Sequence, residues 1–121
     1  RCLILVTPDG QRTMNTFLGA SQFLPATALD ESAIASASVL YLEGYLFDRD
    51  GAKQAFRSAV ETARAAGRTV ALTLSDAFCV DRHREEFLDL IRSGIGILFA
   101  NESEIKSLYQ TASFEDAAMS I

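Results

Sequence analysis

The sequence predicts an α/β fold with three consecutive parallel strands, preceded by a separate β-hairpin. From about residue 38 onward, short apolar runs alternate with segments whose apolar residues recur at helical spacing. Strand, helix, strand order of this kind is typical of right-handed parallel crossovers. Before that point, two strand-like runs flank Asp9-Gly10, a residue pair that strongly favours a tight hairpin turn.

The hairpin is expected over residues 2–18. The Asp9-Gly10 pair predicts a type I′ turn, which requires a positive φ at both central residues. This hairpin does not fit the alternation that follows it, so it is expected to form either an edge of the sheet or a lid. The connection over residues 19–37 is rich in small residues and is expected to hold one short helix near residues 30–36.

The three strands are predicted from apolar runs that are too short for helices. Each run is bounded by turn-forming or helix-starting residues, as expected for strands buried in a parallel sheet. They are expected near residues 38–43, 69–75 and 96–100.

Helical spacing fills the intervals between these strands. The first helix covers residues 52–66, where apolar side chains recur every three or four positions, and Gly67 is a typical stop signal. The second helix is marked by Phe87, Leu88 and Ile91 and stops at Ser93-Gly94. The third begins at Asn101, and its pattern continues toward the end of the sequence.

Composition narrows the possible functions. The 121 residues carry a formal net charge of −5 and include 49% hydrophobic residues, a profile typical of one globular domain. An acidic chain without a basic cluster does not favour nucleic-acid binding. No apolar run approaches the roughly 18 residues of a membrane span, so no membrane partner and a cytoplasmic location are expected. Cys2 and Cys79 are expected to be free thiols.

Polar residues follow each predicted parallel strand, at the strand ends where ligands collect in open α/β sheets. These segments are Glu43-Gly44-Tyr45, Ser75-Asp76 and Asn101-Glu102-Ser103-Glu104.

Asn101 and Glu104 have two compatible interpretations. Asn is a favoured N-cap, and Glu three residues later completes a capping box. A carboxylate at the same position could also hold a hydrated Mg²⁺, which keeps several waters and takes few protein ligands.

Other candidates are also open to two interpretations. Asp76 is either a turn-capping residue or a group near phosphate, metal or substrate. Arg12 is either a surface arginine or, on a lid, a ligand for an anionic phosphoryl group. His83 lies among charged residues and is expected to be solvated. Three aromatic residues are expected to pack rather than to form a stacking platform: Tyr41, Tyr45 and Phe47.

Neither a P-loop nor a G-x-G-x-x-G motif occurs in the sequence. Four segments in order nevertheless resemble those of the ribokinase-like (PfkB) kinases, closest to the adenosine-kinase branch. They are the hairpin segment Asp9–Thr13, the strand ending in a Gly-aromatic pair at Tyr41–Tyr45, the segment Leu72–Phe78, and the N-x-x-E segment Ile97–Glu104.

The resemblance implies a ribokinase-like three-layer sandwich segment and transfer of the ATP γ-phosphoryl group to a sugar or nucleoside hydroxyl with Mg²⁺. Glu104 then helps to organise the metal ion through water, and Asn101 shapes the turn. Arg12 matches the lid arginine, which lies over the substrate and the transferring phosphoryl group. Residues 1–20 are expected to belong to the lid, and residues 21–121 to a partial core.

The resemblance also implies that parts of the kinase lie outside this sequence. The Gly-Gly substrate region of the family is expected before Arg1, and the Gly-Ala-Gly-Asp segment with the general base after Ile121. The chain alone is therefore expected to be inactive, and a homodimer through the lid or an exposed sheet face is possible. The alternative is a non-catalytic α/β module that binds a ligand or a partner.

Overall fold

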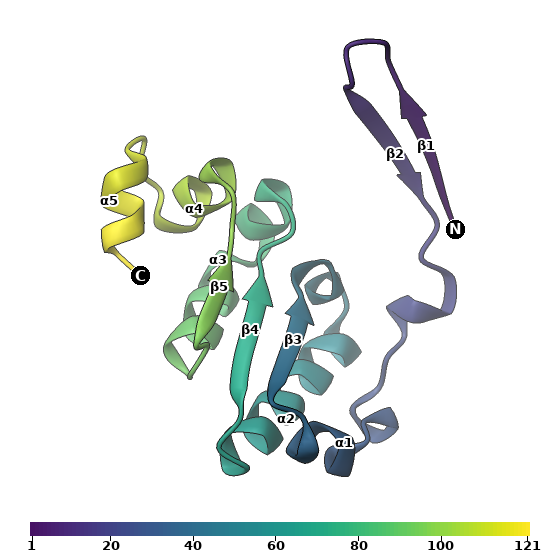
Figure 1. Cartoon of the computed structure of the whole chain (residues 1–121), viewed down its shortest axis with the longest axis vertical. Helices are drawn as coiled ribbons and strands as arrows, with labels where there is room; N and C mark the ends of the chain where they lie inside the picture. Colours follow the sequence, from purple (N-terminus) through teal and green to yellow (C-terminus); the bar gives the residue numbers. More distant parts are fainter.

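The N-terminal hairpin forms where the sequence predicts it. In the computed structural model, which describes residues 1–121, β1 (Cys2–Val6) pairs antiparallel with β2 (Arg12–Thr16). The two strands make a sheet of their own, and Figure 1 shows them projecting away from the rest of the chain. Of the two arrangements expected for the hairpin, a projection is therefore correct and an edge of the main sheet is not.

The turn of this hairpin differs from the predicted type I′ turn. Gly10 donates a hydrogen bond to the Thr7 carbonyl at 2.9 Å, and Thr7 donates one to the Gln11 carbonyl at 2.9 Å. Gly10 has a φ of 82°, but Asp9 is not among the residues with positive φ. Pro8 fixes its own φ near −65°, which suits a three-residue loop ending in a left-handed residue. The type I′ prediction is wrong because it ignored this proline.

The connection after the hairpin contains three short helical segments. Two are 3₁₀ turns, η1 (Gly19–Gln22) and η2 (Ala26–Ala28), and the third is α1 (Glu31–Ser36). Asp30 caps α1 by accepting a hydrogen bond from the Ala33 amide at 3.0 Å. The helix expected near residues 30–36 is therefore confirmed.

The central sheet has three parallel strands in the order β3-β4-β5. They are β3 (Val39–Glu43), β4 (Thr69–Thr73) and β5 (Ile97–Phe99), each within the range predicted for it. The register aligns Tyr41 of β3 with Ala71 of β4, and Ala71 with Ile97 of β5. The predicted α/β fold class is confirmed.

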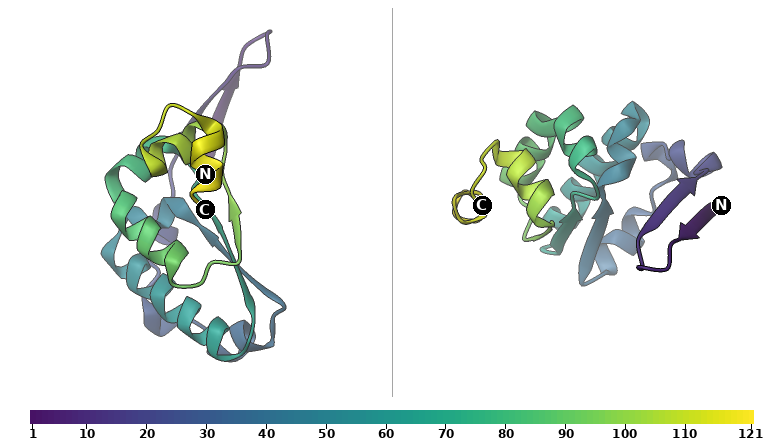
Figure 2. Two further views of the ribbon diagram at one scale, coloured as in Figure 1. Left: turned by 90° about the vertical axis from the view of Figure 1, so that its left-hand side faces the viewer. Right: turned by 90° about the horizontal axis from the view of Figure 1, so that it is seen from above.

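Four helices follow or join these strands: α2 (Asp50–Ala65), α3 (Ala77–Arg92), α4 (Glu102–Tyr109) and α5 (Phe114–Met119). Two of these helices, α2 and α3, cover the sheet. The crossover helices α2 and α3 lie on the same face of the sheet, as Figure 2 shows. The helical pattern expected from Asn101 toward the end of the sequence is confirmed by α4 and by α5, which ends at Met119.

The end of α2 shows why Gly67 stops this helix. Gly67 has a φ of 68° and donates to the Arg64 carbonyl at 2.9 Å. Arg68 donates to the Ala63 carbonyl at 2.8 Å, which completes a Schellman motif. Glycine adopts this left-handed conformation without a Cβ penalty, so the chain leaves the helix here and enters β4.

The core lies between the sheet and the helices on its covered face. It is built from strand residues that alternate toward the helices and from the apolar stripes of α2, α3 and α4. Its main members are Leu42, Phe47, Phe56, Val60, Val70, Leu72, Leu74, Phe87, Leu88 and Leu108. Cys79 is buried and Cys2 exposed, both as free thiols, and none of the helices has the length and apolar character that a membrane crossing requires.

Candidate functional site at the carboxyl edge of the sheet

The parallel topology brings the segments that follow β3, β4 and β5 to one edge of the sheet, the upper edge in Figure 1. Two of these segments are in direct contact, because the Ser75 hydroxyl donates to the Glu43 carboxylate. The sheet pairing also continues past β4, where Leu74 donates to the Phe99 carbonyl at 3.1 Å. The sequence-predicted candidates Asp76, Asn101 and Glu104 therefore lie on one edge, as expected for a ligand site in an α/β sheet.

Asn101 and Glu104 form a complete capping box at the start of α4. The Asn101 side-chain oxygen accepts from the Glu104 amide at 2.9 Å. In return, Glu104 accepts from the Asn101 amide at 3.0 Å and from the Asn101 side-chain NH₂ at 2.8 Å. Glu104 is only 6% exposed and is the one buried charged residue of the chain. The capping interpretation is therefore confirmed, while a role toward a metal ion stays a prediction.

The geometry of Glu104 limits how it could bind Mg²⁺. A carboxylate offers about four lone-pair positions, and the two bonds from Asn101 use two of them. No group of three or more His, Cys, Asp or Glu side chains in the chain is arranged so that it could hold a metal ion. These residues therefore do not fit a direct protein cage for Mg²⁺. They fit contact with the water shell of the ion, which Mg²⁺ usually retains in part.

Asp76 caps α3 at the same edge. Its carboxylate accepts from the Phe78 amide at 2.7 Å and from the Cys79 amide at 3.4 Å. The residue before it, Ser75, has a φ of 70°, in the left-handed region that favours glycine. Such strained residues persist only where the surroundings hold them, and they cluster at functional sites. The capping interpretation of Asp76 is confirmed, and its role toward phosphate or substrate is still a prediction.

Gly44 and Tyr45 shape this edge in a way that the sequence did not reveal. A Cβ at Gly44 would lie 2.6 Å from the Thr73 carbonyl oxygen, so only glycine fits where η3 (Gly44–Asp48) crosses the end of β4. Tyr45 follows it and is partly exposed. Burial raises the pKa of Tyr45, and nearby charges that include Asp76 and Glu104 raise it further. Because Tyr45 lies in η3, directly after β3, it belongs to the same edge as Asp76 and Glu104.

Arg12 lies apart from the other candidates. It begins β2, its backbone pairs with Val6, and its side chain is exposed on the projecting hairpin. The hairpin extends beyond the same end of the sheet at which the carboxyl edge lies (Figure 1). The structure thus brings together Asp76, Asn101 and Glu104 at the edge but leaves Arg12 on the hairpin.

Two expectations about other residues need correction or refinement. His83 was expected to be solvated, and this is wrong: its side chain is only 16% exposed and lies 2.9 Å from Asp48. Its partner is 35 positions away, so no local pattern could reveal the contact. Phe47 packs in the core as expected, whereas Tyr41 and Tyr45 keep large exposed surfaces.

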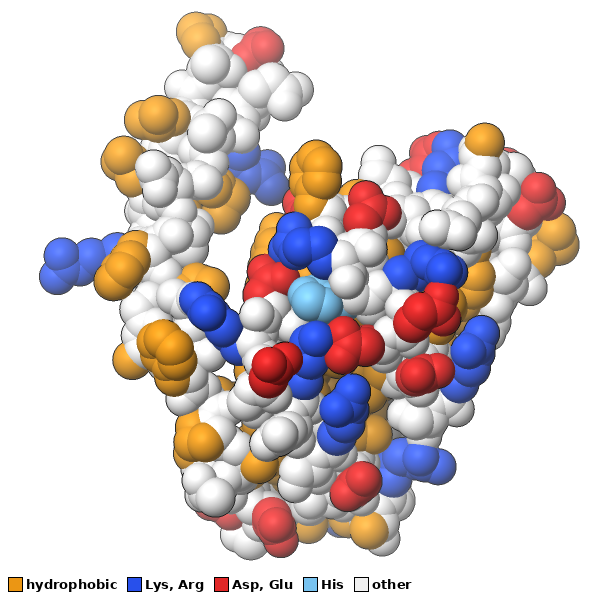
Figure 3. Space-filling view, turned by 180° about the vertical axis from the view of Figure 1, so that it is seen from behind, with side chains coloured by type: hydrophobic (Ala, Val, Ile, Leu, Met, Phe, Trp, Pro, Cys, Tyr) orange, Lys and Arg blue, Asp and Glu red, His pale blue; other side chains and the backbone are white.

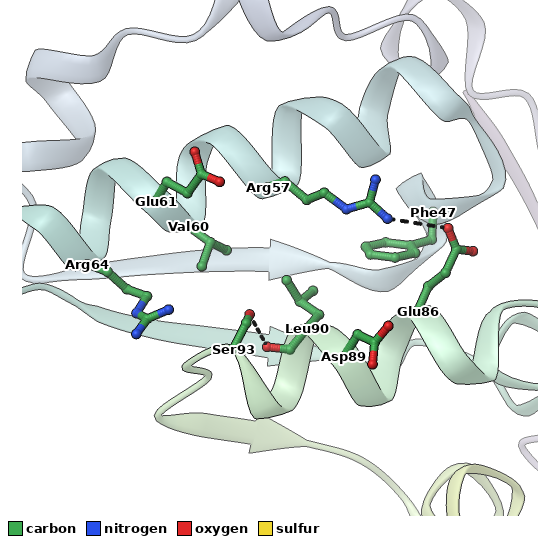
Figure 4. Close-up of a pocket in the computed structure, with 9 residues that line it drawn as sticks. All are labelled: Phe47, Arg57, Val60, Glu61, Arg64, Glu86, Asp89, Leu90 and Ser93. Carbon is green, nitrogen blue, oxygen red and sulfur yellow. Dashed lines mark hydrogen bonds and ion pairs between the residues drawn. The ribbon is translucent and has the colours of Figure 1, made fainter.

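A pocket lies away from this edge, between α2 and α3. Its volume is about 260 Å³, and Figure 4 shows it lined by side chains from both helices, including Arg57, Arg64 and Glu86. None of the sequence-predicted site residues contributes to it. The shallow pocket is therefore distinct from the carboxyl edge.

The chain is similar in sequence to a known kinase. The chain is 30% identical over 111 residues to the guanosine-inosine kinase of Escherichia coli K12, a match that covers 89% of this chain and 26% of that protein. It therefore spans about a quarter of that relative's length.

Solved structures agree with the sequence match. A probable sugar kinase from Rhizobium etli CFN 42 superposes with a TM-score of 0.93 and 50% identity over 99% of this chain and 37% of its own. The adenosine kinase of Sinorhizobium meliloti superposes with a TM-score of 0.91 and 49% sequence identity. This match covers 97% of this chain and 36% of that protein. A putative ribokinase II from E. coli, at 17% identity, covers 98% of this chain and 40% of its own with a TM-score of 0.82, which supports the fold alone.

The family assignment covers nearly the entire sequence. The model of the pfkB family of carbohydrate kinases matches residues 1–120. This range includes the hairpin, the three parallel strands and the capping box at the carboxyl edge. The ribokinase-like resemblance deduced from four short motifs is therefore confirmed, and the chain belongs to the pfkB carbohydrate kinase family.

Proposed function

We propose that this chain is part of a kinase that transfers the γ-phosphoryl group of ATP to a hydroxyl of a nucleoside or sugar. The observation that carries the proposal is the family match over residues 1–120. Two relatives are named as kinases of guanosine and inosine or of adenosine, which favours a purine nucleoside as the acceptor. The acidic, partly strained edge of the parallel sheet is where such a substrate is expected to bind.

The site residues receive distinct roles in this proposal. Phosphoryl transfer depends mainly on positioning and on stabilising charge. Glu104 is proposed to hydrogen-bond to water molecules around Mg²⁺, the ion that neutralises phosphate charge, while Asn101 fixes the carboxylate. Arg12 is proposed to reach the transferring phosphoryl group from the hairpin, since a guanidinium matches phosphate oxygens in a bidentate manner. Asp76 is proposed to lie near phosphate or substrate.

The proposal also divides the chain into two working parts. Residues 1–20 are assigned to the lid and residues 21–121 to a partial ribokinase-like core. We expect the chain alone to be inactive, because the Gly-Ala-Gly-Asp segment that supplies the general base in this family does not occur in the sequence. Any activity therefore belongs to the longer protein of which these residues are part.

The experiment that tests the proposal is Glu104→Gln in the full-length kinase. Loss of the charge should lower kcat by tenfold or more, about 1.4 kcal/mol of barrier, and added Mg²⁺ should partly restore it. The substitution also disturbs the cap, because a Gln amide nitrogen must face one of the two Asn101 donors. A stability loss of about 0.5–2 kcal/mol is therefore expected in addition. Steady-state rates with a purine nucleoside across a Mg²⁺ titration provide the measurement.

Asn101→Ser is the matched control. Serine keeps an N-cap acceptor and leaves the Glu104 charge, but removes the side-chain hydrogen bond to Glu104. We expect a similar stability loss and a smaller loss of kcat than in Glu104→Gln, because the carboxylate keeps its charge but loses one of the bonds that orient it. If both variants lose the same activity and neither responds to Mg²⁺, Glu104 is a helix cap only. If the unaltered kinase phosphorylates neither nucleosides nor sugars, the proposed function itself is wrong.

A further inference from the structure

A polar network centred on His83 joins η3 to α2 and α3, outside the carboxyl edge. The His83 Nε2 lies 2.9 Å from Asp48 Oδ1 at the end of η3, and its Nδ1 lies 3.2 Å from Glu86 Oε2. Figure 3 shows this histidine at the surface, surrounded by acidic and basic side chains. The proposed chemistry does not use any of these groups.

The neighbours of His83 decide which hydrogen bonds its ring can make. Lys53 Nζ lies 3.4 Å from His83 Nδ1 and 2.6 Å from Glu86 Oε2. An ammonium group only donates, whereas a neutral imidazole has one donor and one acceptor nitrogen. Because the Asp48 carboxylate only accepts, Nε2 is the donor of this hydrogen bond, while Nδ1 either accepts from Lys53 or, in the protonated ring, donates to Glu86. The donor that faces η3 is thus fixed by the surroundings of the ring.

Asp48 anchors one end of η3, and Gly44 anchors the other. Arg82 donates to Asp48 Oδ1 from Nε at 3.1 Å and to Oδ2 at 2.9 Å, so two side chains of α3 hold this carboxylate. Gly44 is fixed against the end of β4 by the close approach described above, and its carbonyl accepts from the Cys79 thiol at 3.5 Å. Tyr45, which belongs to the carboxyl edge, lies between these two anchors.

His83 also occupies a break in α3. Its φ of −126° and ψ of 24° are not helical, so the helix kinks at this residue. The kink separates the first part of α3, which begins at the Asp76 cap, from the part that packs Phe87 and Leu88 into the core. A side chain at the kink that bonds to η3 therefore connects two of the three segments at the carboxyl edge, those that follow β3 and β4.

We propose that His83 is a positioning residue of the site, which fixes η3 and the first turns of α3 through its hydrogen bond to Asp48. The proposal rests on the kinase function proposed above, because it concerns the same edge. His83 touches no reacting group in this scheme. It acts by holding Tyr45 and Asp76 in place for the bound substrate.

The test uses two substitutions in the full-length kinase that separate the two ring nitrogens. A Gln amide reaches the position of the His Nε2 and can donate to Asp48, whereas an Asn amide reaches only the Nδ1 position. We expect His83→Asn to lower kcat/KM for a purine nucleoside by about tenfold, because small misplacements of positioning groups are costly. His83→Gln should stay within about twofold of the unaltered enzyme.

Thermal melting of both variants distinguishes positioning from simple loss of stability. A merely structural role predicts that both variants melt earlier while each folded molecule keeps normal kinetics, and that result would overturn the proposal. Equal losses of kcat/KM in the Asn and Gln variants would overturn it as well. Such a result would mean that a donor at the Nε2 position does not restore the activity.

Amide hydrogen exchange gives a readout that does not depend on activity. In the full-length protein without substrate, His83→Asn should accelerate exchange over residues 44–49, and His83→Gln should not. If the unaltered protein has no kinase activity, the proposed function fails, but the exchange experiment still tests the anchor. Exchange that is unchanged in both variants would show that Arg82 alone holds Asp48, and the inference would be wrong.

Discussion

Gly44 shows how one residue without a side chain sets the shape of the carboxyl edge. A Cβ at this position would lie 2.6 Å from the Thr73 carbonyl oxygen and 2.8 Å from that of Leu74. Both neighbours are backbone atoms of the central strand and its continuation, so they cannot move aside as a flexible side chain can. The sequence identified Gly44 by its place after a predicted strand and by a family likeness, while the structure supplies the steric reason.

Gly44→Ala should therefore destabilise the full-length protein by about 1–3 kcal/mol, the usual cost of forcing extra volume into a packed site. Gly51→Ala is the matched control. Gly51 lies in the first turn of α2, nothing lies within 4 Å of the Cβ that would be added, and helix propensity predicts a gain of roughly 0.5–1 kcal/mol. Chemical denaturation of both variants measures the difference. If the Gly44→Ala and Gly51→Ala variants are equally stable, η3 moves aside without a cost in the free energy of unfolding.

Residue-scale prediction from the sequence succeeded where the interacting partners are close in the chain. Asn101 and Glu104 are three positions apart, so the capping box follows from local geometry alone. His83 and Asp48 are 35 positions apart, and their contact depends on how η3 packs against α3. Gly44 meets Thr73 for the same tertiary reason. The missed residues are those whose role is defined by long-range contacts.

At the scale of elements, the spacing of apolar residues and the helix start and stop signals located the strands and the main helices. Helical spacing is a local property, and both Gly67 and Asn101 mark boundaries that the structure reproduces. The exception is the hairpin turn, where Pro8 excludes the turn type that Asp9-Gly10 alone favours. An element is therefore predicted well when each of its local signals points to the same conformation.

The contacts between elements are pH-dependent through Asp48 and Glu86. Burial of Asp48 works to raise its pKa, but hydrogen bonds from His83 and Arg82 outweigh this and lower it below its ordinary value of 3.8. The hydrogen bond from Lys53 is the main cause that lowers the pKa of Glu86 below 4.5. Groups with a lowered pKa stabilise the folded state above their ordinary pKa. That stabilisation is lost as pH falls through the folded-state value.

We therefore expect the Asp48→Asn/Glu86→Gln double variant to lose less stability on acidification than the unaltered full-length protein. Above pH about 5 the unaltered protein should be the more stable of the two, and the gap should narrow as the pH falls below about 4. Urea denaturation midpoints at several pH values measure this gap. A gap that is constant over the whole range would show that these carboxylates make no pH-dependent contribution to stability.

At the scale of the whole molecule, one face of the sheet is covered and the other is open. Figure 2 shows α2 and α3 on the covered face. The open face carries large apolar side chains, with Tyr41 55% and Phe99 53% exposed and their ring centroids 6.3 Å apart. Val39 and Ile97 extend this patch. An exposed sheet face was expected from the sequence, but the strand register, which aligns Tyr41 with Ala71 and Ile97, determines which residues form it.

The patch predicts that the isolated 121-residue chain associates in solution. Contiguous exposed apolar surface of this kind usually marks a site of contact, and association removes it from water. Tyr41→Lys/Phe99→Lys should shift the chain toward monomer in sedimentation velocity. Glu61→Lys is the matched control, because it changes the net charge by the same two units at an exposed position of α2. It should leave association unchanged. Adding Arg12→Gln to this control would alter the hairpin.

The outcome also locates the contact. The hairpin exposes apolar side chains of its own, among them Leu3 and Val6, and a two-stranded hairpin is at best marginally stable alone in water. If the Tyr41/Phe99 variant remains as associated as the unaltered chain, the contact lies outside this patch, for example on the hairpin. If the unaltered chain is a monomer with a high melting temperature, the open face does not drive association and the prediction is wrong.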